Sequence, residues 1–265
     1  MTTPIVMTIS GHDPVGGAGV SADIEAIGSQ GCHAVSVITC ITVQDTHDVY
    51  RVEPLPDYLI LQQAEALLPD MNISAIKVGL LHTVEAVKAV RTLIREAPQN
   101  IPIVLDPSLS VGIGHQGNRE VEQAIRADLL PLITLLTLNN HELARLAQLP
   151  DANAQEQAQA LFNEGCKAIL VTGTNEPTAQ IENALYQDGQ LTKVWSWERL
   201  PHHYSGSGCT LTAACAALLA KRMDLMKALM IAQSYTWGAL EAGRAIGQGV
   251  RVPNRLYWLP QGKKI

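Results

Sequence analysis

The sequence predicts an α/β fold with a mostly parallel central sheet and helices on both of its faces. Hydrophobic residues make up 47% of the 265 residues, which is enough for a large core, and only one residue is Phe. An aliphatic core is typical of parallel strands that are covered by helices. Short β-branched runs also alternate with amphipathic segments of helical length, and this alternation indicates repeated right-handed strand–helix–strand units.

The predicted elements follow one another along the chain. Runs rich in β-branched residues are predicted to be strands, at 5–10, 34–43, 75–78, 103–105, 135–137 and 168–171. Segments with apolar residues at helical spacing are predicted to be helices, at 21–30, 57–68, 83–96, 119–130, 140–148 and 155–164. Because helices separate consecutive strands, we expect crossover connections and a parallel sheet.

The pattern changes after Gly173. The runs 181–186 and 191–195 flank the pair Asp188-Gly189, which is a strong signal for a β-hairpin, so an antiparallel edge is expected on that side. Two further helices are predicted, at 210–221 and 225–245. Neither a Ser/Pro-rich linker nor an internal repeat divides the sequence, and a single domain over residues 1–265 is therefore predicted.

Composition argues against several classes of protein. The formal net charge of −6 does not suit a nucleic-acid binder, which needs a basic surface. The most apolar stretch, 211–220, is too short to span a membrane, and no signal-type segment is found at the N-terminus, so a cytoplasmic protein without a membrane partner is predicted. Five cysteines without a C-x-x-C pair fit a reducing compartment, and the histidines lack ligand spacing, so no transition metal is expected.

In such a sheet, ligands bind outside the carboxyl ends of the strands. The segments that follow the predicted strands are therefore candidate site residues, at 11–19, 44–45, 79–80, 106–107, 139–142, 172–174 and 206–210. The run Ser205–Thr210 contains two glycines and precedes an apolar helix, where free backbone N–H groups and the helix dipole favour an anion. A flexible loop that only caps the helix fits the same pattern.

Cys209 is expected on the first turn of that helix, where thiol pKa values are commonly lowered. A buried structural thiol is the alternative. Asp106 ends an apolar strand and precedes Pro107, so its carboxylate is expected to face the ligand crevice and to serve Mg²⁺ or a water, unless it only forms a turn. Asn139 and Glu142 stand at a helix start, where capping alone would also explain them.

The first glycine loop does not predict a dinucleotide site. Residues 17–22 match the relaxed pattern G-x-G-x-x-A, but the loop is too long for the tight turn of that site, and no acidic residue ends a strand about twenty residues later. The P-loop pattern G-x-x-x-x-G-K-[ST] is also absent. Any nucleotide phosphate must therefore be held without the lysine of that motif.

Taken in order, these motifs resemble those of the hydroxymethylpyrimidine and phosphomethylpyrimidine kinases of thiamin synthesis, a branch of the ribokinase-like superfamily. The matching segments extend over nearly the whole chain, at Gly11–Asp23, Ser36–Gln44, Lys77–Leu81, Leu105–Pro107, Asn139–Glu142 and Gly206–Leu211. The resemblance implies a three-layer ribokinase-like sandwich and ATP-dependent phosphorylation of a hydroxymethyl group on a small ring.

The resemblance also implies roles for individual residues. Asp23 and Gln44 would hydrogen-bond the aminopyrimidine, and Gly11 and Leu80 would line the ring. The residues at ATP and Mg²⁺ would be Asp106, Asn139, Glu142 and Thr172, with Asp106 and Glu142 nearest the metal. The amides of Gly206, Ser207, Gly208 and Cys209 would stabilise the transferring phosphoryl group, and Cys209 would accept the proton of the substrate hydroxyl or position that hydroxyl.

Several positions depart from the family pattern. Thr172-Gly173-Thr174 stands where Lys-Gly-Gly is usual, so a cationic contact to the ATP phosphates is missing. Ser205, Ser207, Leu80 and Leu138 replace the usual His, Thr, Met and Pro. A pyridoxal or pyridoxine kinase and a non-catalytic pyrimidine sensor therefore remain alternatives, whereas a NAD-dependent dehydrogenase fits least. Analogy with the family also predicts a homodimer.

Overall fold

The structure is a computed structural model that describes residues 3–109, 118–173 and 178–259. Its centre is a nine-stranded sheet with the order β3-β2-β1-β4-β5-β6-β7-β8-β9. The strands are β1 Ile5–His12, β2 His33–Gln44, β3 Val49–Pro54, β4 Ile73–Val78, β5 Ile103–Leu105, β6 Leu135–Asn139, β7 Ala168–Thr172, β8 Gln180–Gln187 and β9 Gln190–Glu198. The neighbouring strands β2, β1, β4, β5, β6 and β7 pair in parallel. At the two edges, β3 pairs with β2, β8 with β7 and β9 with β8 in the antiparallel direction.

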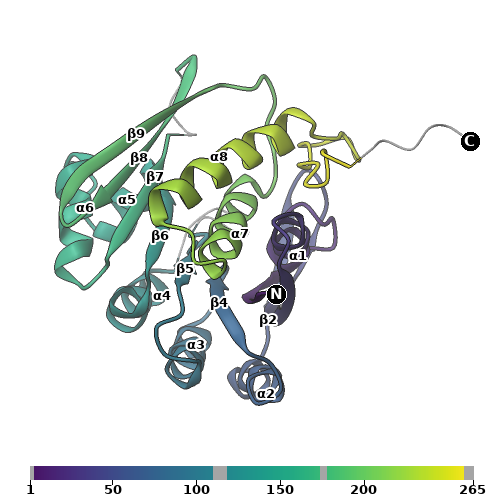
Figure 1. The fold of residues 1–265 in the computed structure, drawn as a ribbon, viewed down its shortest axis with the longest axis vertical. Coiled ribbons are helices and arrows are strands. Elements are labelled where there is room, and N and C mark those ends of the chain that lie inside the picture. The colour runs from purple at the N-terminus through teal and green to yellow at the C-terminus, as the bar shows by residue number, and fades with distance from the viewer. Residues whose placement is uncertain (1–2, 110–117, 174–177, 260–265) are drawn as a thin grey trace, which may run out of the picture.

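Helices cover both faces of the sheet. They are α1 Gly19–Ser29, α2 Asp57–Leu67, α3 Val84–Glu96, α4 Arg119–Ala124, α5 Asn140–Ala147, α6 Ala154–Asn163, α7 Ser207–Ala220 and α8 Leu225–Glu241. In Figure 1, α1, α7 and α8 lie on one side of the sheet and α2 to α6 on the other. Two buried apolar clusters fill the two interfaces, so the molecule has three layers.

Helix α7 is the central helix of its layer. Its sequence is apolar on all sides, and every residue from Cys209 to Ala220 is buried. It packs against α1 and α8 and against strands β1, β4, β5 and β6. A helix that is apolar all round needs such surroundings, and the small Ala side chains allow the neighbouring elements to approach closely. The N-terminus of α7 is thereby held at the carboxyl ends of the parallel strands.

The structure extends the sequence-based prediction in three places. The strand Val49–Pro54 was not predicted, and its antiparallel pairing with β2 gives the sheet a second antiparallel edge beside the expected hairpin. Helix α7 begins at Ser207, earlier than the predicted residue 210, so Gly208 and Cys209 belong to its first turn. The predicted helix 119–130 continues beyond α4 as a π-helical segment, Ile125–Leu129.

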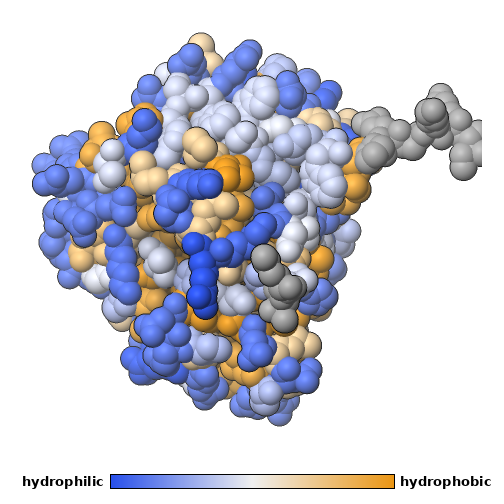
Figure 2. Space-filling view, viewed as in Figure 1, coloured by the Kyte–Doolittle hydropathy of each residue, from blue (hydrophilic) through white to orange (hydrophobic). Residues whose placement is uncertain are grey.

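The surface carries no large apolar region on the face seen in Figure 2, where hydrophilic residues surround smaller apolar patches. Exposed apolar side chains of α8 include Met226 and Met230. Among the residues that the structure describes, no helix is long and apolar enough to cross a membrane.

Candidate active site

A cavity of about 370 Å³ opens at the carboxyl ends of the parallel strands. The structure brings together there almost all of the residues predicted for the site, which are Gly11, Gln44, Leu80, Asp106, Asn139, Glu142, Thr172, Gly206, Ser207, Gly208 and Cys209. They come from both halves of the chain. Asp23 is the predicted residue that does not line the cavity. Thr174, which was expected beside Thr172, lies outside the described residues.

The first glycine loop, residues 11–19, is organised by Asp13. The two carboxylate oxygens of Asp13 accept hydrogen bonds from the backbone N–H of Val15 at 2.8 Å and of Ala18 at 2.7 Å. Gly19 has a φ of +59°, and a Cβ at this position would lie 2.2 Å from the carbonyl oxygen of Gly11. The loop therefore folds back on itself, and this turn requires glycine at Gly19.

The second glycine loop begins α7. Gly206 is the N-cap residue with a φ of 76°, and no side chain caps the helix. The first N–H groups of a helix have no partner inside the helix. Because a side-chain cap is lacking, these N–H groups remain available to an anion in the cavity, and the helix dipole adds positive potential. This geometry is compatible with an anion at the start of α7, and the anion site stays a prediction.

Cys209 differs from its expected state. Burial raises the pKa of the Cys209 thiol to about 11, although the charge of Lys77 acts in the opposite direction. The prediction of a lowered thiol pKa is therefore wrong for the ligand-free protein, because loss of solvation outweighs the helix start and the nearby cation. At neutral pH Cys209 is a thiol, and its sulfur accepts a hydrogen bond from the Gly19 backbone.

Two carboxyl groups lie together at the cavity wall. Asp106 follows β5, and one of its oxygens accepts hydrogen bonds from the backbone and the hydroxyl of Ser108, both at 3.3 Å. Burial raises the pKa of Asp106, and the charge of Lys77 opposes this effect. Glu142 has a pKa raised to about 7, mainly by burial and also by the charge of Asp106. Both shifts favour the protonated forms, so a cation bound at this pair would be needed to stabilise the two carboxylates in their charged forms.

Glu142 is held by a capping box at the start of α5. The Asn139 side chain accepts a hydrogen bond from the Glu142 backbone at 3.0 Å, and Glu142 accepts one from the Asn139 backbone at 3.1 Å. The second oxygen of Glu142 accepts a hydrogen bond from the backbone of Leu109 at 3.2 Å. The capping interpretation of this motif is therefore confirmed, and the same cap orients Glu142 at the cavity, where its role at the phosphates stays a prediction.

Gln44 ends β2 and presents its amide to the cavity. The Thr42 hydroxyl donates to the Gln44 side-chain oxygen at 2.9 Å, so the amide is oriented before any ligand binds. Close to it, Gly11 is packed so tightly that a Cβ would lie 2.7 Å from the Cys40 sulfur and 3.3 Å from Leu80. Gly11 and Leu80 therefore lie close together in the cavity wall, where a side chain at position 11 has no room.

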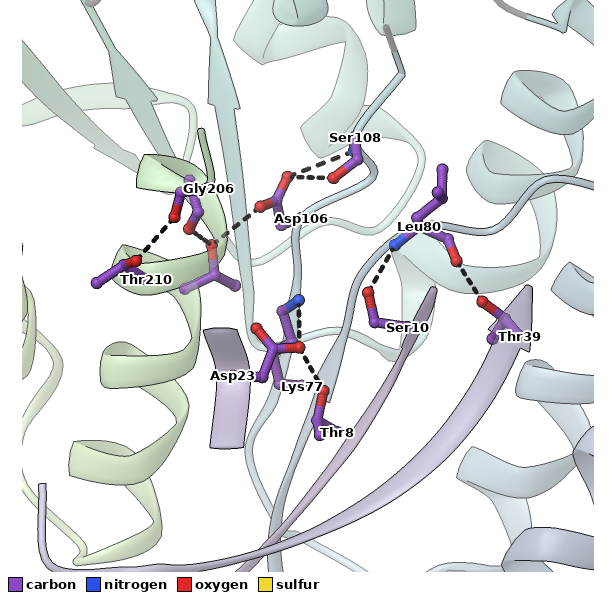
Figure 3. A network of polar contacts seen from close by, with 12 residues as sticks. Thr8, Ser10, Asp23, Thr39, Lys77, Leu80, Asp106, Ser108, Gly206 and Thr210 are labelled. Carbon is purple, nitrogen blue, oxygen red and sulfur yellow. Dashed lines mark hydrogen bonds and ion pairs between the residues drawn. The ribbon is translucent and has the colours of Figure 1, made fainter. Parts of the chain in front are cut away.

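Asp23 lies beneath the cavity and not on its wall. Its side chain is fully buried and forms an ion pair with Lys77, whose nitrogen is 2.9 Å from one carboxylate oxygen; Thr8 donates to the same oxygen at 2.5 Å (Figure 3). The expected direct hydrogen bond between Asp23 and a ring is therefore not provided by this geometry. The other oxygen, Oδ1, is buried without a partner among the described residues.

Lys77 lies in the segment Lys77–Leu81, which is one of the segments that resemble the family, but no role was predicted for it. Burial opposes its charged form, but the charges of Asp23 and Asp106 and the hydrogen bond to Asp23 outweigh that effect and raise its pKa. A cation is thus retained behind the anionic part of the site. Among the described residues that line the cavity itself, neither Lys nor Arg is present. A lysine inside an otherwise apolar strand is the signal that could have identified this position.

A further group of wall residues was missed by sequence reasoning. Asn183 and Trp197 donate hydrogen bonds to the side-chain oxygen of Gln233 at 2.9 and 3.0 Å, and all three line the cavity between the β8–β9 hairpin and α8. These residues lie on three separate elements. No local pattern in the sequence connects them.

The site contains a donor set that fits Mg²⁺. Among the described residues, no group of three or more His, Cys, Asp or Glu side chains is arranged to hold a metal ion. Mg²⁺, however, is usually bound by one or two carboxylates together with phosphate oxygens and water. Asp106 and Glu142 could supply those carboxylates, and phosphates and water would have to supply the rest.

The chain is similar to known kinases. A family model described as phosphomethylpyrimidine kinase matches residues 13–254. A hydroxymethylpyrimidine/phosphomethylpyrimidine kinase from Synechococcus elongatus is 35% identical over 258 residues, which cover 94% of this chain and 96% of that protein. A phosphomethylpyrimidine kinase from Clostridium difficile has a TM-score of 0.75 at 25% identity, covering 91% of this chain and 99% of the other.

The fold is also shared with a pyridoxal kinase from Bacillus subtilis that was solved in complex with ADP. This similarity has a TM-score of 0.88 at 24% identity and covers 97% of this chain and 99% of the other, and it concerns the fold alone. The predicted ribokinase-like fold is confirmed by these structures and by the mostly parallel nine-stranded sheet. Since the family model covers most of the chain, the chain belongs to the phosphomethylpyrimidine kinase family.

Proposed function

We propose that this protein transfers the γ-phosphoryl group of ATP to the hydroxymethyl group of an aminopyrimidine, or to its monophosphate, in thiamin biosynthesis. The observation that carries the proposal is one cavity that combines an oriented amide at Gln44, a carboxyl pair and an uncapped helix N-terminus. Family membership supports it. Because both halves of the chain contribute, we propose that residues 1–265 act as one domain.

In the proposed complex, Gln44 would recognise the edge of the ring. Its amide N–H groups can donate to a ring nitrogen, and its oxygen has a further lone pair for an exocyclic amine beside the bond from Thr42. Gly11 and Leu80 would lie against the ring. Asp23 would act indirectly, by holding Lys77 in its charged form behind the site.

In the transfer step, the substrate oxygen forms a bond to the γ-phosphorus, and the bond from that phosphorus to the bridging oxygen of ADP breaks. The amides of Ser207, Gly208 and Cys209 would face the transferring group. Asp106 and Glu142 would hold Mg²⁺, with Asn139 and Thr172 near the phosphates; when bound, Mg²⁺ supplies neutralisation of the phosphate charge.

Cys209 would position the hydroxyl group. Because its thiol is protonated at neutral pH in the ligand-free protein, we do not assign it proton acceptance there. A loose transition state requires little help from a base, so the proton can leave to a phosphoryl oxygen and then to solvent. The predicted homodimer, the cytoplasmic location and the lack of a nucleic-acid partner stay predictions.

The function is tested by measuring ADP release with hydroxymethylpyrimidine, its monophosphate and pyridoxal side by side. The aminopyrimidines should be favoured about tenfold or more, because a pyridine ring would leave buried polar groups of the site unpaired at a cost of roughly 1–3 kcal/mol each. Gln44→Leu should remove that preference, whereas Gln62→Leu, on the exposed surface of α2, should keep it. Preference for pyridoxal would support a pyridoxal kinase, and ring binding without turnover would support a sensor.

A further inference from the structure

Arg255 is a buried cation outside the wall of the cavity. It follows α8 in the C-terminal segment, and only 1% of its surface is exposed. Its guanidinium donates to the Thr210 hydroxyl at 2.9 Å, to the Gly16 carbonyl at 3.2 Å, to the Gly17 carbonyl, and to the Glu25 carboxylate at 3.0 Å. All three guanidinium nitrogens are therefore occupied.

Apart from Glu25 in α1, these acceptors belong to the first glycine loop and to the start of α7. Gly16 and Gly17 lie in the first loop, and Thr210 lies on the first turns of α7. The Thr210 hydroxyl also donates to the Gly206 carbonyl at 2.7 Å (Figure 3), so it connects Arg255 to the N-cap of α7. The two loops touch directly as well, because a Cβ on Gly206 would lie 1.8 Å from the Gly17 carbonyl oxygen.

The C-terminal segment holds other parts of the cavity too. The Val250 backbone donates to the Thr46 carbonyl at 2.9 Å, two residues after Gln44, and the Ser205 backbone donates to the Arg251 carbonyl at 2.9 Å. Arg255 is itself fixed, since its carbonyl accepts hydrogen bonds from Ser29 at 2.6 Å and Tyr235 at 2.8 Å. The segment thus spans the loops that the proposed reaction has to align.

A simple charge effect does not explain this arrangement. The ionic partner of Arg255, Glu25, has 49% of its side chain exposed, so that contact is screened by solvent. The remaining acceptors are neutral oxygens in two separate elements, the first glycine loop and α7. A planar guanidinium fixes the mutual orientation of its acceptors, which an ammonium group does not.

We propose that Arg255 is a positioning residue that sets the register between the first glycine loop and the N-terminus of α7. The inference rests on the proposed function, in which the ring lies at the first loop and the phosphoryl group at α7. Losing the register would leave both binding regions intact but separate the reacting atoms. A shift of about 1 Å in such an alignment can lower the rate about 100-fold.

The test compares Arg255→Lys with the matched variant Arg251→Lys in the same segment, whose side chain donates a single hydrogen bond among the described residues, to the Gly243 carbonyl at 3.4 Å. We expect Arg255→Lys to lower kcat about tenfold or more and to change the KM of ring and ATP less than about threefold. Arg251→Lys and Glu25→Gln should keep the kcat of the unaltered protein. Thr210→Val, which removes the contact from the other side, should repeat the kcat loss if Arg255→Lys folds poorly.

Hydrogen exchange gives a readout that does not depend on activity. In Arg255→Lys, the amides of residues 15–19 and 206–210 should exchange faster, with those of β7 unchanged. Two outcomes would overturn the inference. In the first, kcat and hydrogen exchange are both unchanged. In the second, exchange is faster throughout the sheet and the affinities for ring and ATP fall together. If the unaltered protein phosphorylates none of the three rings, the proposed function fails, and localised exchange alone then decides whether Arg255 sets the loop register.

Discussion

Helices α5 and α6 begin with the same motif, but only one of them contributes to the candidate site. Asn139-x-x-Glu142 and Asn153-x-x-Glu156 both form complete capping boxes with hydrogen bonds of 3.0–3.1 Å. Glu142 is buried beside Asp106, whereas Glu156 is exposed. A local motif therefore determines a helix start, and the surroundings determine whether that start takes part in chemistry.

The start of helix α7 differs from the starts of α5 and α6. It begins without a side-chain cap, at a glycine in the left-handed conformation, and its first turn faces the cavity. The box of α5 and the box of α6 each satisfy two N–H groups, those of the N-cap residue and of the third helical residue. The end of α7 is left open, which is useful only where a ligand supplies the missing acceptor.

The largest effect is expected from Gly206→Ala. Its φ of 76° costs a residue with a Cβ about 1–2 kcal/mol, and the added atom would lie 1.8 Å from the Gly17 carbonyl oxygen. We expect kcat to fall about 100-fold or more because the start of α7 must move. The control is Gly28→Ala in α1, which meets nothing within 4 Å and should stabilise the protein by about 0.5–1 kcal/mol. Equal kinetics in the two variants would show that α7 is not part of the site.

The next effect separates the two identical boxes. If Glu142 holds Mg²⁺ at the phosphates as proposed, Glu142→Gln should lower turnover by roughly 10- to 100-fold, whereas Glu156→Gln should change it less than about twofold. Steady-state kinetics at saturating Mg²⁺ and ATP measure both. Similar losses in the two variants would mean that the box at α5 only caps its helix.

Glu142 should make the free energy of unfolding depend on pH. Its pKa is raised from 4.5 to about 7 in the ligand-free protein. Between these pH values Glu142 is ionised in the unfolded chain but protonated in the folded protein. The contribution of this difference to the free energy of unfolding is therefore fully present below pH 4.5 and is lost as pH rises through about 7. Urea unfolding without divalent ions should show a loss on the order of a few kcal/mol relative to Glu142→Gln. A constant difference across this range would contradict the shift.

The smallest effect concerns the cap of α6. Asn153→Ala removes the acceptor for the Glu156 backbone and should lower the free energy of unfolding by about 1 kcal/mol. The kinetic constants should stay unchanged, because α6 does not line the cavity. Thermal unfolding and ADP-release assays on the same sample test both statements, and a change in KM would link α6 to the site.

Much of the fold could be predicted because its signals are local. The strand Ile103–Leu105 was predicted with the bounds that the structure has, and Asp188-Gly189 marked the turn between β8 and β9. The strand β3, Val49–Pro54, gave no such signal, because it is a short, largely exposed edge strand that ends in Pro and depends on its pairing with β2.

Local sequence patterns were enough to predict the order of elements, the glycine loops and the residues that end the parallel strands, because each depends on neighbours a few positions away. The tertiary structure alone decided that Asp23 lies beneath the cavity with Lys77 and that Cys209 is protonated at neutral pH. It also decided that Arg255 joins two loops, since its contact with Gly16 spans 239 residues. Burial and long-range contacts set the charge and orientation of these groups, and neither can be read from a local pattern.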